Sequence, residues 1–288
     1  MFDTIIIGKG AAGITAAIYL KRYNKHVLVI GKDLGALEKP VKIENYYGFT
    51  EGIDGRKLIQ NGIDQAKNLG IDVFDEEVVQ IDNSLDYFLV TTPENEYKAK
   101  TVLIATGKKR SPINVKGFKH LQGKGISFCV TCDGFFFRNK RLALVGYNEF
   151  MLHELSDMEL LTNKITIFTE GHELTQLVKH PVVTDKITEF TGEEFLTGIK
   201  TSNGSYAFDG VFIALGTPSA ADFALRVGAI LDKDNLVVNE NYQTNIEGLY
   251  AAGDAIGGWL QLTKASYDGM MAAMNIKDKL NELKRVSK

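Results

Sequence analysis

The chain has 288 residues, of which 44% are hydrophobic and 24% are charged, and its formal net charge is −3. This length predicts two domains, and the composition is typical of a soluble globular protein, which excludes a disordered chain, a collagen and a coiled coil. The apolar runs are shorter than the roughly 20 residues that a membrane-spanning helix needs, and the acidic chain carries no nucleic-acid-binding motif, so we expect neither a membrane nor a nucleic acid as a partner.

The N-terminus and the cysteine content predict the compartment. Residues 1–8 contain no basic region and only a three-residue apolar run, so we expect no secretory signal. Two cysteines, Cys129 and Cys132, are too few for a disulfide-stapled secreted fold. We therefore expect a cytoplasmic protein whose thiols form a redox pair.

The first thirty residues predict a strand, a turn, a helix and a second strand. Residues 4–8 form a short apolar run that ends in glycine, residues 11–22 have helical character, and residues 27–30 form a second apolar run. Both runs are continuously apolar, which favours a parallel sheet that is covered on both faces.

The turn in this unit, Gly8-Lys9-Gly10-Ala11-Ala12-Gly13, fits the G-x-G-x-x-G pattern of dinucleotide-binding loops. Gly8 permits the tight turn, Gly10 lets the backbone approach a pyrophosphate, and Gly13 allows the helix to pack closely on the strand. The N-terminus of the helix then faces the phosphate charge. A strand before the loop and a helix after it favour a nucleotide site over an ordinary glycine-rich turn.

The second strand ends in Ile30-Gly31-Lys32-Asp33, without an acid directly at the strand end. Such an acid usually binds a ribose of the dinucleotide. Asp33 is the candidate for that role, and a position on the loop surface is the alternative.

The rest of the first domain predicts one helix and three strands. Residues 59–69 form the helix, with Gly70 as its stop signal. Residues 78–82 and 87–91 predict antiparallel neighbours, and residues 101–105 predict a buried strand that ends at Thr106-Gly107.

The two cysteines stand in the run Cys129-Val130-Thr131-Cys132-Asp133. This spacing permits a short reversible disulfide, a lowered thiol pKa would create a nucleophile, and Asp133 is placed to pass protons. A zinc site would need two more ligands, and His120 and His153 stand at no metal-type spacing. We predict a redox pair and no metal; inert thiols are the other alternative.

A basic segment surrounds the cysteines. Eleven basic residues and one acid, Asp133, lie between Lys98 and Arg141, so this segment carries +10 and the remainder −13. Such a surface favours an acidic partner, and an ordinary solvated surface is the alternative.

A second unit of the same kind begins at Arg141. Its predicted elements are strands at 142–145, 164–168 and 211–215 and a helix at 149–161. Residues 102–107 and 211–216 resemble each other and stand at similar places in the two units. The sequence therefore predicts an α/β fold with two dinucleotide-binding-type, Rossmann-like domains.

The C-terminal region contains Gly248-Leu249-Tyr250-Ala251-Ala252-Gly253-Asp254-Ala255. In a flavin site, Asp254 at the strand end would accept hydrogen bonds from a polyol chain, and the following helix, residues 262–280, would direct its positive end there. A capped strand-to-helix loop is the alternative. We expect this helix to return to the first domain, which then comprises residues 1–112 and 241–288, with residues 113–240 inserted.

In this order, the motifs make the chain resemble the low-molecular-weight thioredoxin reductases over nearly its whole length. The run Ile43-Glu44-Asn45-Tyr46-Tyr47-Gly48-Phe49 adds to the resemblance. It implies a homodimer that binds FAD in the first domain and reduces thioredoxin. The implied FAD-binding residues are Gly8, Gly10, Ala11, Ala12, Gly13, Lys32, Asp33, Asn45, Val78, Thr106, Gly107, Gly253, Asp254, Gln261 and Leu262.

The resemblance also implies roles at the thiols. By position, Cys132 is the thiol next to the flavin, Cys129 attacks the thioredoxin disulfide, and Asp133 matches the proton donor. Gln261 matches a flavin-contacting glutamine, whereas Leu260 replaces the arginine that usually precedes it. We expect the run Phe135–Phe137 to pack beside the thiols, and Trp259 either to shield the flavin or to pack elsewhere.

The inserted domain departs from the family pattern at the NADPH site. The glycine-rich loop reads Gly146-Tyr147-Asn148-Glu149, and the basic cluster for the 2′-phosphate is replaced by Thr169-Glu170-Gly171-His172. Side chains stand where pyrophosphate needs bare backbone, and Glu170 repels a phosphate. We predict that NADPH binding is lost; an acid at position 170 suits the ribose of NADH, but the missing glycines argue against it.

This departure resembles the ferredoxin-dependent flavin thioredoxin reductases, a branch that does not use pyridine nucleotides. We expect reduced ferredoxin, an acidic protein, as the electron donor, with the basic segment as a docking surface. The alternatives are an NAD(P)H-dependent reductase with an atypical loop, a second flavin as donor, and a non-catalytic flavin-binding protein.

Overall fold

The computed structural model describes residues 1–38, 42–107, 114–128, 130–174, 176–215, 219–232 and 235–286. The chain divides into two compact units, and each is described by itself. The first combines Met1–Lys109 with Ser219–Lys288, and the second comprises Arg110–Pro218. The predicted fold class is confirmed, because one unit is inserted into a discontinuous other.

The first unit contains the N-terminal and the C-terminal elements. They are β1 (Phe2–Ile7), α1 (Ala11–Arg22), β2 (Val27–Ile30), η1 (Gly35–Leu37), β3 (Lys42–Ile43), β4 (Ile53–Asp54), α2 (Gly55–Asn68), β5 (Asp72–Phe74), β6 (Gln80–Asn83), β7 (Phe88–Thr91), β8 (Glu96–Ile104), α6 (Ala220–Arg226), β17 (Leu231–Asp232), β18 (Asn235–Leu236), β19 (Leu249–Ala251), η3 (Gly253–Ile256) and α7 (Leu262–Val286).

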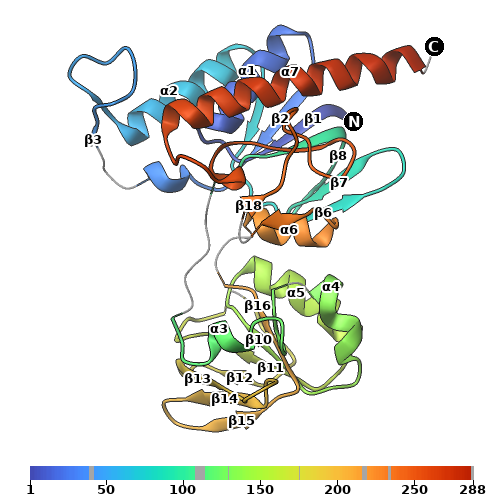
Figure 1. The fold of residues 1–288 in the computed structure, drawn as a ribbon. Coiled ribbons are helices and arrows are strands. Elements are labelled where there is room, and N and C mark those ends of the chain that lie inside the picture. The colour runs from blue at the N-terminus through green and yellow to red at the C-terminus, as the bar shows by residue number, and fades with distance from the viewer. Residues whose placement is uncertain are drawn as a thin grey trace. The chain divides into compact units, whose positions relative to one another are not determined.

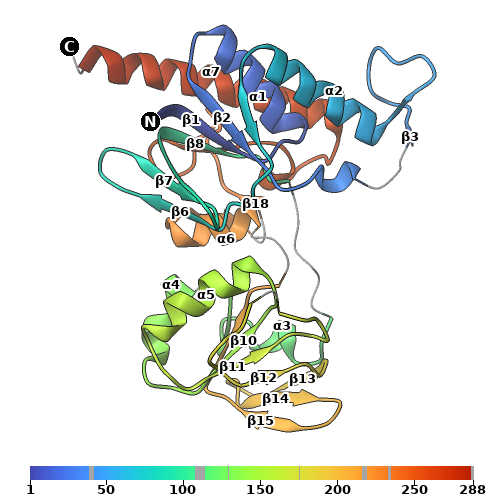
Figure 2. The ribbon, with the colours of Figure 1, turned by 180° about the vertical axis from the view of Figure 1, so that it is seen from behind.

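The main sheet of this unit has the order β5-β2-β1-β8-β7-β6, with β19 beside the second half of β8. Strands β5, β2, β1, β8 and β19 run parallel, and β6 and β7 form the predicted antiparallel pair. Alternate residues of β1 enter different cores: Ile6 packs with α1, α2 and α7, and Ile5 and Ile7 pack with α6. Figures 1 and 2 show the three long helices on one face of the sheet.

The second unit contains the remaining elements. They are α3 (Phe118–Leu121), β9 (Ile126–Ser127), α4 (Val130–Asp133), η2 (Gly134–Phe137), β10 (Leu142–Val145), α5 (Glu149–Glu159), β11 (Ile165–Phe168), β12 (Val182–Val183), β13 (Ile187–Thr191), β14 (Gly198–Thr201), β15 (Ser205–Ala207) and β16 (Gly210–Ile213).

Its parallel sheet has the order β12-β11-β10-β16-β9, and β13-β14-β15 form a separate antiparallel sheet. The alternation of side chains again separates two cores. Leu142 and Leu144 of β10 pack under α5, whereas Ala143 and Val145 pack against β13 and β14. The β10–α5–β11 crossover of this unit repeats the β1–α1–β2 crossover of the first.

The chain returns to the first unit earlier than the sequence suggested. The inserted unit spans residues 110–218 rather than 113–240. The reason is α6, which begins with a capping box between Ser219 and Asp222. Its residues Phe223 and Ala224 are buried in the core behind β1 and β8, so this segment belongs to the first unit.

None of the helices in the described ranges is long and apolar enough to cross a membrane.

Candidate functional site

Three of the predicted cofactor motifs lie at one edge of the main sheet. Strands β1, β8 and β19 are parallel neighbours whose final residues Ile7, Ile104 and Ala251 stand in register. The fingerprint loop, the pair Thr106-Gly107 and the pair Gly253-Asp254 each follow one of these ends. This is the edge at which open parallel sheets bind their ligands.

The fingerprint glycines have different reasons to be glycine. A Cβ at Gly8, where φ is +112°, would overlap the carbonyl group of Ala105, and a Cβ at Gly13 would overlap the carbonyl oxygen of Gly8. Among the described residues, a Cβ at Gly10 would meet nothing within 4 Å. Gly8 and Gly13 are therefore required by the fold itself, whereas the space beside Gly10 is open to a ligand.

The residues at this edge fit a dinucleotide. Within the described part of the chain, the first turn of α1 has no acidic side chain and no side-chain cap, so its N–H groups are available to phosphates. The Thr106 hydroxyl is buried without a hydrogen-bond partner among the described residues. Gly107 has a φ of +71°, and no atom of the described residues lies within 4 Å of where its Cβ would be. Ala11 and Ala12, which follow Gly10, carry no side chain that would block the loop.

Two predicted cofactor residues from distant parts of the chain meet directly. Nδ2 of Asn45 donates to Oε1 of Gln261 at 3.0 Å, across 216 residues of sequence. Leu262 follows as the first residue of α7. The structure thus brings the loop before β4 and the start of α7 together.

Other predicted cofactor residues have partners within the protein. Lys32 makes an ion pair with the buried Glu77 at 2.6 Å. Oδ1 of Asp33 accepts the N–H of Gly35 at 2.8 Å. Val78 is buried in the apolar core, so its side chain serves packing. These three residues remain predictions as cofactor contacts.

The redox motif lies in the inserted unit. Cys129 is outside the described residues, and Cys132 is part of α4. Oγ of Ser127 donates to Oδ2 of Asp133 at 2.6 Å, which fixes the carboxylate beside the motif. The N–H of Val130, the residue after Cys129, donates to the buried Glu154 at 3.2 Å. Asp133 is thus held at the end of α4, the turn that contains Cys132.

The three phenylalanines after Asp133 divide into two kinds. Phe137 packs edge-on against Phe212. Phe135 and Phe136 are 70% and 75% exposed, which the sequence interpretation did not anticipate. Trp259 is likewise exposed. Phe135 and Phe136 thus form an exposed aromatic pair directly after the redox motif.

The loop after β10 is filled by side chains of the protein. The rings of Tyr147 and His172 stack at 3.8 Å between centroids, with an angle of 19° between their planes. Oδ1 of Asn148 caps α5 by accepting the N–H of Met151 at 3.3 Å. Oε1 of Glu170 accepts the N–H of Ile187 at 2.8 Å.

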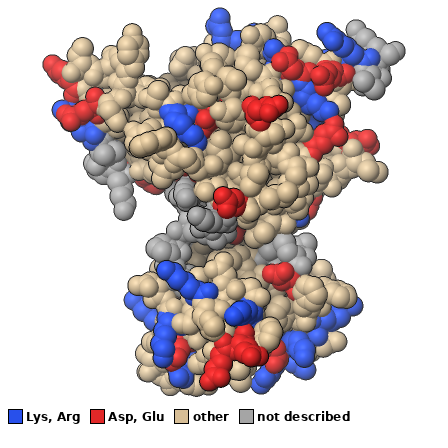
Figure 3. Space-filling model, viewed as in Figure 1, with Lys and Arg blue, Asp and Glu red and all other residues tan. Residues whose placement is uncertain are grey.

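The basic segment is partly neutralised. Lys100 pairs with Asp3 at 3.1 Å, Lys116 with Glu189 at 2.8 Å and Arg141 with Asp209 at 3.2 Å. Lys119, Lys124, Arg138 and Lys140 are exposed. Figure 3 shows Lys and Arg interspersed with Asp and Glu on the face that it presents.

The sequence interpretation missed the charged groups beneath the Gly253 loop. Lys264 and Asp268, one turn apart on α7, form an ion pair at 2.7 Å, and Asp268 is 2% exposed. The i, i+4 spacing of a lysine and an acid on a predicted helix is the signal that was available.

Comparison with known proteins agrees with this geometry. The family model of the pyridine nucleotide-disulphide oxidoreductases matches residues 2–147 and 178–269. A thioredoxin reductase of Listeria monocytogenes is 30% identical over 99% of this chain and 95% of its own length.

Two solved structures are also similar. The atypical thioredoxin reductase TRi of Desulfovibrio vulgaris Hildenborough has a TM-score of 0.92 and 31% identity, covering 98% of this chain and 99% of that one. A ferredoxin-flavin thioredoxin reductase of Clostridium acetobutylicum has a TM-score of 0.75 and 32% identity, covering 98% of both chains. The chain therefore belongs to the pyridine nucleotide-disulphide oxidoreductase family and, within it, to the thioredoxin reductases, which are FAD-binding flavoproteins.

Proposed function

We propose that this flavoprotein reduces the disulfide of a thioredoxin through FAD and the Cys129–Cys132 pair, with electrons from reduced ferredoxin. The observation that carries the choice of donor is the stack of Tyr147 on His172. A Rossmann-type loop binds a pyrophosphate through bare backbone at the N-terminus of its helix. Here the loop bears a tyrosine whose ring is engaged by a histidine from the loop after β11.

The N-terminus of α5 is also capped by a side chain of the protein itself. Asn148 supplies a side-chain cap, and Glu149 places a negative charge in the first turn. A phosphate at this position would have to displace the cap and would meet a carboxylate of like charge. Both features oppose NADPH and NADH alike.

Glu170 bears on NADH in particular. An acid after the second strand of a Rossmann unit can bind a ribose hydroxyl. The Glu170 carboxylate instead accepts the N–H of Ile187, and its backbone has a φ of +53°. This hydrogen bond engages one carboxylate oxygen of Glu170 within the protein, which adds to the case against NADH.

Energetics support ferredoxin. When bound, FAD supplies the chemistry that joins a one-electron donor to a two-electron disulfide. A ferredoxin near −400 mV and a thioredoxin near −270 mV differ by about 130 mV, which for two electrons is on the order of 6 kcal/mol downhill. The similar protein from Clostridium acetobutylicum is named for ferredoxin and flavin, which adds support.

The chain's own groups then account for the exchange. The Cys129 thiol passes its proton to the Asp133 carboxylate and, as a thiolate, attacks the thioredoxin disulfide. One thioredoxin thiolate leaves and takes that proton back from Asp133. Cys132 attacks the mixed disulfide and releases the second thiol, so the pair becomes a disulfide. Two electrons from two reduced ferredoxins, with two protons, restore the dithiol.

The surfaces for the partners form part of the proposal. The exposed rings of Phe135 and Phe136 offer thioredoxin an apolar contact beside the thiols. The exposed basic residues Lys119, Lys124 and Lys140 offer an acidic ferredoxin a docking site. We further propose that the protein is a cytoplasmic homodimer.

An anaerobic titration tests the donor. The flavin absorbance is followed while NADPH, then NADH, then reduced ferredoxin are added to the full-length protein. We expect the flavin to stay oxidised with both nucleotides and to bleach with ferredoxin, after which added thioredoxin reoxidises it. Rapid bleaching by either nucleotide would reject the proposed donor, and more than one flavin per chain would support a second flavin as donor.

A further inference from the structure

Lys264 makes an unusual set of contacts at the cofactor edge of the first unit. Its Nζ donates to the carbonyl oxygen of Gly253 at 3.1 Å and to that of Gly257 at 2.6 Å. The same ammonium pairs with Oδ2 of Asp268 at 2.7 Å. An ammonium has three N–H donors, so these contacts use all of them.

These contacts hold both peptide groups that flank Gly253. The N–H of Gly253 donates to Oδ2 of Asp268 at 3.1 Å, and the carbonyl of Gly253 accepts from Lys264. Asp268 is itself fixed, because the hydroxyl of Tyr242 donates to its Oδ1 at 3.1 Å. The orientation of the peptide that leads into Asp254 is therefore set by α7.

The loop has a particular need for such support. Gly253, Gly257 and Gly258 all have positive φ values, of +73°, +74° and +77°. Glycine adopts positive φ values without a steric penalty, but its backbone loses more conformational entropy on folding than that of other residues. A partly buried ion pair that joins both ends of the turn removes this freedom, because Lys264 binds the carbonyls of residues 253 and 257 together.

We propose that Lys264 is a positioning residue for FAD. It closes the turn 253–257 on α7 and so holds Asp254 in the orientation that binds the polyol chain. Because its donors are all engaged, Lys264 acts through this turn and does not contact the cofactor. The proposal rests on FAD binding at this edge and is independent of the electron donor.

The test compares ligands that occupy different halves of the site. FAD and ADP are titrated into full-length protein from which the flavin has been removed, for the wild type and for Lys264→Met. We expect the FAD dissociation constant to rise by about 10- to 100-fold, the usual effect of losing charged hydrogen bonds. The ADP dissociation constant should stay within about twofold, since ADP lacks the polyol chain that Asp254 is proposed to bind.

Matched variants separate positioning from general stability. Lys264→Arg keeps the charge and should recover part of the FAD affinity. Lys279→Met removes an exposed ion pair with Glu247 from the same helix and should change neither affinity. Lys264→Gln, which keeps an amide donor, is the second test variant.

The outcomes are distinct. Weakened FAD binding with unchanged ADP binding supports the proposal, and so does recovery by arginine. FAD affinity within about twofold of the wild type in Lys264→Met or Lys264→Gln would overturn it. An equal loss for FAD and ADP would also overturn it, because the lysine would then support the fold in general. None of these results depends on ferredoxin or thioredoxin.

Discussion

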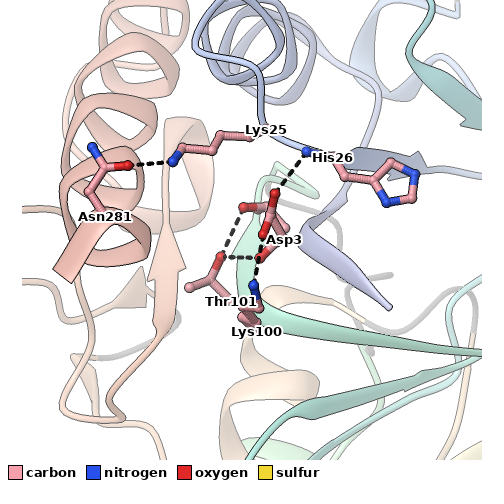
Figure 4. Close-up of polar contacts among 7 residues, drawn as sticks. Asp3, Lys25, His26, Lys100, Thr101 and Asn281 are labelled. Carbon is pink, nitrogen blue, oxygen red and sulfur yellow. Dashed lines mark hydrogen bonds and ion pairs between the residues drawn. The ribbon is translucent and has the colours of Figure 1, made fainter. Parts of the chain in front are cut away.

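Asp3 lies at the beginning of β1, at the end of the strand opposite to the fingerprint loop (Figure 4). Its Oδ2 accepts the N–H of His26 at 3.0 Å, and its Oδ1 accepts from Lys100 at 3.1 Å. The Thr101 hydroxyl donates to the Asp3 carbonyl at 3.0 Å. One carboxylate thus joins the beginnings of β1 and β2 to β8.

The pKa of Asp3 makes this contact sensitive to pH. Burial alone would raise the pKa, but the hydrogen bonds from His26 and Lys100 more than offset it and hold the pKa below the ordinary value of 3.8. A carboxyl whose pKa is lowered by folding stabilises the protein above its unfolded pKa. This contribution is lost as the pH falls through the lowered, folded pKa.

We therefore expect Asp3→Asn to lower the free energy of unfolding by about 1–2 kcal/mol near pH 7. The difference from the wild type should shrink as the pH falls below about 4. Urea unfolding curves at a series of pH values measure both effects. Asp72→Asn, at an exposed position on β5, is the control; a constant difference at every pH would contradict the role of the charge.

For single residues, the sequence indicated which side chains could take part in the chemistry, but not which side chains they contact. The thiol pair, Asp133 and the glycines were recognisable because short motifs fix residue type and spacing. The ion pair of Lys32 with Glu77 could not be recognised from the sequence, because the two residues follow different strands, which become neighbours only when the sheet forms. The structure therefore identifies Glu77 as the partner of Lys32, which the sequence motif did not indicate.

At the scale of elements, the glycines at the N-terminus of α1 serve two different purposes: Gly13 is required by the fold, and Gly10 leaves space for the cofactor. Gly10→Ala adds a methyl group to open space, whereas Gly13→Ala drives one into the Gly8 carbonyl. We expect Gly10→Ala to fold normally and to bind FAD at least about tenfold more weakly. Gly13→Ala should lose on the order of 2–4 kcal/mol of stability.

Thermal unfolding without flavin and FAD titration measure these two effects. A stable Gly13→Ala variant, or unchanged FAD affinity in Gly10→Ala, would contradict this division of roles.

Long or strongly apolar elements were predictable, and short ones were not. The bounds of α1, β2 and β10 agree with the sequence, because each is a buried run between clear turn signals. Helix α6 was missed, since its seven residues are too few for helical periodicity. Its Ser219 and Asp222 form a capping box, a signal that would have indicated the helix start and the earlier domain boundary.

At the scale of the whole molecule, each unit has its own cores, with the thiols in one unit and the fingerprint loop in the other. Such separation predicts that changes at the thiols leave flavin binding intact. The presence of two similar domains was readable from the sequence because the two strand motifs at 102–107 and 211–216 repeat. The insertion was readable because the last helix was expected to return to the first domain. The filled loop at Tyr147 was readable only in part, since His172 reaches it through the fold.

Replacing each cysteine by serine in turn tests the different roles proposed for the two thiols in the full-length protein. We expect Cys129→Ser to lose disulfide turnover by about a thousandfold or more, because it removes the proposed attacking thiolate. The flavin should stay bound and should still be reduced by the proposed donor, ferredoxin. Cys132→Ser should instead accumulate a mixed disulfide with thioredoxin, since the second thiol that releases it is absent. Gel electrophoresis without reductant detects this adduct. An adduct on Cys129→Ser and none on Cys132→Ser would reverse the assigned roles, and full turnover in Cys129→Ser would favour a flavin-binding protein whose thiols take no part.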